Sequence, residues 1–96
     1  MKNSITNGSE SQKKWAISIL ENSIKKIQKE LNNAVSRVED KSMPESWLII
    51  VHKNYEIIFN KLMKIQKAET LIKYKDVDFG HELHKKSVQD YELKLS

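Results

Sequence analysis

The chain contains no cysteine, which excludes a disulfide scaffold and thiolate metal sites. One proline and two glycines among 96 residues are too few for the tight turns of a multi-stranded sheet. No apolar run approaches the roughly 18 residues that span a bilayer, and the first residues lack the apolar core of a secretory signal. We therefore expect an all-α protein of the cytoplasm without a membrane span.

The sequence also lacks the usual combinations of catalytic residues. No nucleophile is paired with a base, and no glycine-rich phosphate loop or cofactor motif is present, so we expect neither enzymatic activity nor a cofactor. His81 and His84 are three residues apart, whereas the zinc-protease signature separates its histidines by four. We interpret both as solvent-facing rather than as metal ligands, and His52 as a residue at the edge of the core.

A long helix with a well-defined start is predicted near the N-terminus. Ser9 and Gln12 have the spacing of a capping box, and Gly8 before them lets the entering chain turn. Residues 1–8 are polar and predict a flexible tail ahead of a single helical domain over 9–96. The helix over about 10–40 follows from an apolar stripe of coiled-coil type, at Ile17, Leu20, Ile24, Ile27, Leu31, Ala34 and Val38.

Two further helices are predicted after a break at 39–44. Ser42 and Glu45 repeat the capping spacing, and Pro44 suits a first helical turn. The second helix, over about 44–75, has a wide apolar stripe that implies contact on two sides. A shorter helix over about 79–95, with Asp78 as its N-cap, completes the fold. Its apolar face comprises Phe79, Leu83, Val88, Tyr91 and Leu95.

These elements describe an all-α fold, a long antiparallel helical hairpin with a shorter C-terminal helix. Each hairpin helix measures about 45 Å at 1.5 Å per residue, so the third helix can cover only part of the hairpin. We expect exposed apolar surface, available to a homodimer or to a protein partner.

Positive charge is concentrated in the second half of the chain. Six lysines and two glutamates give residues 49–75 a net charge of +4, equal to that of the whole chain. A ridge for nucleic acid or an acidic partner is predicted, with a solvated helix face as the alternative. Its residues are Lys53, Lys61, Lys64 and Lys67. Arg37 is the single arginine, which argues against base-specific recognition.

Large aromatic side chains are the candidate anchors for a protein partner. Aromatic residues dominate the energetics of both cores and interfaces, so a core position is the alternative for Trp47, Tyr55 and Phe59. The candidates are Trp15, Trp47, Tyr55 and Phe59.

The helix start resembles a class of small helical proteins from phages, plasmids and integrated elements. The likeness rests on Gly8-Ser9-Glu10-Ser11-Gln12, on Trp15-Ala16 and on a later Ser46-Trp47, about a quarter of the chain. In that class the second tryptophan tends to be followed by an acidic residue, an amide and an arginine, whereas Leu48 and two isoleucines follow it here. The resemblance implies a mobile-element origin and a role in blocking or redirecting a host machine.

The leading hypothesis is a non-enzymatic binding protein of a mobile genetic element, an inhibitor of a bacterial defence nuclease of the anti-CRISPR type that acts by protein–protein occlusion. A net charge of +4 does not suit mimicry of DNA phosphates. A bacteriocin immunity protein and a basic nucleic-acid-binding accessory factor are the alternatives.

Overall fold

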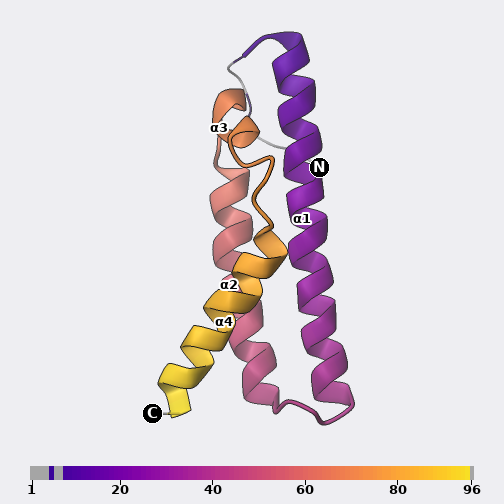
Figure 1. Ribbon diagram of the computed structural model, residues 1–96, viewed down its shortest axis with the longest axis vertical. Coiled ribbons are helices and arrows are strands. Elements are labelled where there is room, and N and C mark those ends of the chain that lie inside the picture. The colour runs from indigo at the N-terminus through magenta and orange to yellow at the C-terminus, as the bar shows by residue number, and fades with distance from the viewer. Residues whose placement is uncertain (1–4, 6–7, 96) are drawn as a thin grey trace.

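The structure, a computed structural model, describes residue 5 and residues 8–95, with the backbone alone at residue 95. Within these residues the chain forms four helices, which confirms the all-α class. They are α1 (Glu10–Glu39), α2 (Glu45–Met63), α3 (Ala68–Ile72) and α4 (Phe79–Leu95). Helices α1 and α2 form an antiparallel hairpin, and α4 crosses one side of it (Figure 1).

Helix α1 begins with the predicted capping box. The Gln12 backbone N–H donates to the Ser9 hydroxyl over 3.2 Å, and the Ser9 N–H donates to the Gln12 side-chain oxygen over 3.0 Å. The apolar stripe then faces the core, where Leu20 and Ile27 are completely buried. Two N–H groups that a helix start leaves open are thus satisfied by side chains, and the seam holds the rest of the helix against its neighbours.

The turn between α1 and α2 differs from the predicted cap. Pro44 is the N-cap residue of α2 and has no side-chain cap hydrogen bond. The Ser42 hydroxyl instead donates backwards to the Arg37 carbonyl, and the Ser42 N–H donates to the Asp40 carboxylate over 2.9 Å. The Ser42 hydroxyl and N–H lower the pKa of Asp40 below its ordinary value. The capping prediction for Ser42 was wrong because this serine closes the end of α1, not the start of α2.

The second predicted helix is two helices. Helix α2 ends at Met63, and α3 occupies Ala68–Ile72, so a continuous helix over 44–75 was wrong. The reason lies in the core, where Leu62 and Leu71 are both buried. Nine residues at 100° each would place these two leucines about 180° apart around one helix. The break after Met63 turns Leu71 back towards α1, against which α3 packs.

Helix α4 is held against both helices of the hairpin. Asp78 caps it as predicted, since its carboxylate accepts from the His81 N–H over 3.1 Å. Phe79 and Leu83 enter the core, as predicted for this face, and Val88 and Tyr91 pack against its edge. The side chain of Leu95 lies outside the described residues.

All four helices contribute to one apolar core. The predicted tail over residues 1–8 lies largely outside the described residues; of the two that are described, Ile5 packs against the core. Among the helices that the structure describes, none combines the length and the apolar character needed to cross a membrane.

Gly80 sets how closely α4 approaches α1. A Cβ atom at this position would lie 2.9 Å from the backbone oxygen of Lys26, closer than real Cβ contacts. Because that oxygen belongs to the middle of α1, it cannot move without bending the helix. We expect Gly80→Ala to destabilise the fold by about 1–3 kcal/mol through overpacking, against the gain of about 1 kcal/mol that helix propensity alone predicts for alanine.

Urea unfolding followed by circular dichroism measures this free energy. Gln89→Ala, an exposed change on the same helix, should stay within about 0.5 kcal/mol of the parent protein. If Gly80→Ala leaves stability unchanged or raises it, the close approach of α4 to α1 is wrong.

Candidate functional site

Trp47 belongs to the core. Its side chain is 2% exposed, and its ring makes edge contacts with His84 and Tyr91 at centroid distances of 5.9 and 5.7 Å. Its indole nitrogen is buried and has no hydrogen-bond partner among the described residues. The prediction of Trp47 as a partner anchor is therefore corrected, because α4 crosses over it and removes it from the surface.

The other three candidate anchors are more accessible but do not form one patch. Tyr55 and Phe59 are half-buried on α2, with their rings stacked at 5.9 Å. Trp15 is exposed near the start of α1, where the Lys75 ammonium lies 5.6 Å from its ring centroid. That distance is within the range of a cation–π contact. The structure thus places Trp15 beside the loop after α3, apart from the aromatic pair on α2.

The predicted lysine ridge is interrupted. Lys53 and Lys61 are exposed on α2, but the helix ends at Met63, so Lys64 is its C-cap residue. Lys67 lies in extended backbone as the N-cap residue of α3. The four lysines are all exposed, but they do not follow one helical face as a continuous helix would have required.

An apolar groove lies between α1 and α2. Its volume is about 400 Å³, and its lining is Leu31, Val35, Leu48, Ile49 and His52. Leu31 and Val35 are each two residues from Asn33, which faces α4, so they lie about 160° away from it around α1. The apolar groove is therefore on the side of the hairpin that α4 does not cover.

Ile49 makes this groove unusual for a surface. Its side chain is 68% exposed beside the half-buried Leu48. The expectation of exposed apolar surface is confirmed at this place. Neither Ile49 nor Val35 was among the predicted site residues. The wide apolar stripe of α2 indicated contact on two sides, and it is the signal that could have found them.

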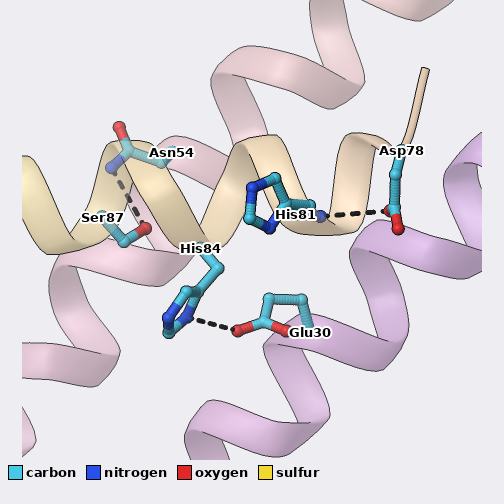
Figure 2. A network of polar contacts seen from close by, with 6 residues as sticks. All are labelled: Glu30, Asn54, Asp78, His81, His84 and Ser87. Carbon is cyan, nitrogen blue, oxygen red and sulfur yellow. Dashed lines mark hydrogen bonds and ion pairs between the residues drawn. The ribbon is translucent and has the colours of Figure 1, made fainter.

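A basic groove lies on the other side of α1, beside the start of α4. Its volume is about 500 Å³. The lining comprises Lys26, Lys29, Glu30, Asn33, Arg37, Asp78, Gly80, His81 and His84. Figure 2 shows His84 of α4 pointing towards Glu30 of α1, and the backbone of His81 hydrogen-bonded to Asp78.

His84 departs from the prediction that both histidines face solvent. Its Nδ1 lies 3.0 Å from the Glu30 carboxylate of α1, and that glutamate side chain is 16% exposed (Figure 2). The His84 ring also makes a T-shaped contact with Trp47. His84 therefore ties α4 to α1, whereas His81 is exposed as expected. Among the described residues there is no group of three His, Asp or Glu side chains arranged to hold a metal ion.

A second polar contact joins α4 to α2. The Asn54 amide nitrogen donates to Asp90 over 2.9 Å and to the Ser87 hydroxyl over 3.3 Å. Asn54 and Ser87 are buried, and no described residue is a hydrogen-bond partner of the Asn54 side-chain oxygen. Sequence reasoning missed these residues, since a polar side chain on an apolar helix gives no sign of whether it will be buried.

Comparison with protein-family models, with curated proteins and with solved structures finds no match for this chain.

The contact of Asn54 with α4 leads to a prediction about stability. Asn54→Ala leaves the Asp90 carboxylate and the Ser87 hydroxyl without their donor at a partly buried position. We expect a loss of about 1–3 kcal/mol, typical of an unsatisfied buried polar group. Urea unfolding of the variant measures it.

Asn60→Ala is the matched control, an exposed asparagine on the same helix that should change stability by less than about 0.5 kcal/mol. Equal effects of the two substitutions would show that the α2–α4 contact does not hold in solution.

Proposed function

We propose that this protein is a non-enzymatic binding protein that docks a partner protein in the apolar groove. The observation that carries the proposal is the exposure of Ile49 within a groove lined by four aliphatic side chains and His52. Contiguous apolar surface of this kind is characteristic of protein interaction sites, because leaving it in water is unfavourable.

An amphipathic helix is the occupant that suits the groove best. Two antiparallel helices form its walls, and a third helix can insert its apolar side chains between them. Helix α4 does this on the other side of the same hairpin, where Phe79 and Leu83 enter between α1 and α2. A partner helix in the apolar groove would complete the packing of the hairpin on its uncovered side.

The finer proposal is inhibition of a bacterial defence nuclease by occlusion. It is supported by the likeness of the Ser9 helix start to that of small mobile-element proteins. The net charge of +4 favours docking through the apolar groove over mimicry of DNA. A second copy of this chain is the competing occupant of the groove.

Ile49→Glu tests the groove directly. The substitution places a charge where a partner must exclude water, while Ile49 is too exposed for a large effect on folding. The assay uses bacterial strains that each carry one RNA-guided defence nuclease directed against a phage. In at least one strain, the parent protein should raise the plating efficiency of that phage. We expect the plating efficiency with Ile49→Glu to be at least about tenfold lower than with the parent protein, because a buried charge of this kind weakens docking by about 1.4 kcal/mol for each tenfold in Kd.

Ile57→Glu is the control, since Ile57 is also exposed on α2 but does not line the groove. It should protect the phage as well as the parent protein does. An equal loss of plating efficiency in both variants contradicts the proposal.

Light scattering of the purified protein tests whether a second copy of the chain occupies the groove. A mass near 11.3 kDa leaves the groove open to a partner, whereas a dimer that Ile49→Glu dissociates overturns the proposal.

A further inference from the structure

The basic groove has unpaired positive charge. It contains Lys26, Lys29 and Arg37, and among the described side chains these three form no ion pair. Both acidic residues in the groove are engaged: the Asp78 carboxylate accepts from the His81 N–H, and the Glu30 carboxylate contacts His84. Because both carboxylates keep their charge, the three cations leave the groove with a formal charge of +1 when its histidines are neutral.

The cations are arranged along a line rather than around a point. Lys26, Lys29 and Arg37 lie on one face of α1 at separations of three and eight residues. From the first to the last they extend over about 16 Å at 1.5 Å per residue. A single small anion could contact only part of this row, whereas an extended polyanion could contact all of it.

Planar side chains accompany the cations. His81 is exposed on α4, and the Arg37 guanidinium is exposed on α1, both at the groove. Histidine rings and guanidinium planes stack on the faces of unpaired nucleobases, while lysines contact phosphates. The α2 lysines differ in their placement, because Lys53 and Lys61 line neither the basic groove nor the apolar groove.

We propose that the basic groove binds a single strand of nucleic acid, with Lys26 and Lys29 on the phosphates and His81 and Arg37 stacked on bases. This function goes beyond protein docking and uses the opposite side of α1. A duplex offers no unpaired base faces to the planar side chains, so the groove prefers a single strand. Without bidentate base contacts, binding does not depend on sequence.

Fluorescence anisotropy with a labelled oligouridylate of about 12 nucleotides tests the proposal, since single-strand sites cover about 4–16 nucleotides. We expect binding at about 50 mM salt that weakens steeply as salt rises. Lys26→Gln with Lys29→Gln should weaken binding at least tenfold. It should also reduce the slope of log K against log salt by about 1.4, or 0.7 for each lost phosphate contact.

Lys53→Gln with Lys61→Gln is the matched control, because it removes the same charge from exposed positions on α2. This variant should keep the slope of the parent protein. If both double variants lose affinity equally, binding depends on the net charge of the protein and not on the basic groove, and the proposal fails. Absence of binding at about 50 mM salt also overturns it.

Arg37→Lys separates stacking from charge. It keeps the positive charge but removes the plane, so we expect about fivefold weaker binding with an unchanged salt slope. An unchanged affinity would contradict the stacking role.

Two competitors define the ligand class. A duplex of equal length and a polyglutamate of equal charge should each compete at least tenfold less well than unlabelled oligouridylate. Equal competition by either one overturns the proposal. Ile49→Glu should bind the strand normally, so failure here and failure of the docking proposal are separate results.

Discussion

Helix α4 lies across one side of the α1–α2 hairpin, and both candidate surfaces result from that placement (Figure 1). Two long helices side by side form a furrow on each of their two sides, and a third helix of 17 residues can fill one of them. On the filled side the apolar stripes become core. On the open side Leu48 and Ile49 remain at the surface, and at the margin between α4 and α1 the basic groove forms.

The contacts that place α4 are more polar than those of the rest of the core. Asn54 reaches Asp90, His84 reaches Glu30, and Gly80 permits close approach to α1. Polar contacts of this kind are directional, so they specify one position for a helix, but each contributes only about 0.5–3 kcal/mol net. The unpartnered nitrogen of Trp47 is a cost of the same arrangement. The position of α4 therefore depends on a few specific contacts, and the wall that α4 gives to the basic groove depends on the same contacts.

The features that the sequence predicted correctly depend on interactions between residues close together in the chain. The Ser9 capping box and the Asp78 cap each involve residues within one helical turn, and both are confirmed. The α1 stripe repeats a spacing of three or four residues, and its central members Leu20, Ile24, Ile27 and Ala34 are buried. Tertiary contacts decided the rest. Nothing local between residues 63 and 68 breaks a helix; the break satisfies the core, which needs both Leu62 and Leu71.

The candidate sites were harder to predict for the same reason. Trp47 is buried by a helix that begins 32 residues later, so its exposure could not be read from its own neighbours. The net charge of each segment placed the positive excess in residues 49–75. In the structure, unpaired cations instead lie together on the face of α1 that borders α4. A groove is a property of two faces brought together, and a segment sum does not distinguish faces. The two grooves lie on opposite sides of α1, so a docked helix and a bound strand would not compete for space. Such an arrangement suits a target that is itself a complex of protein and nucleic acid, because both components could be held by one short chain.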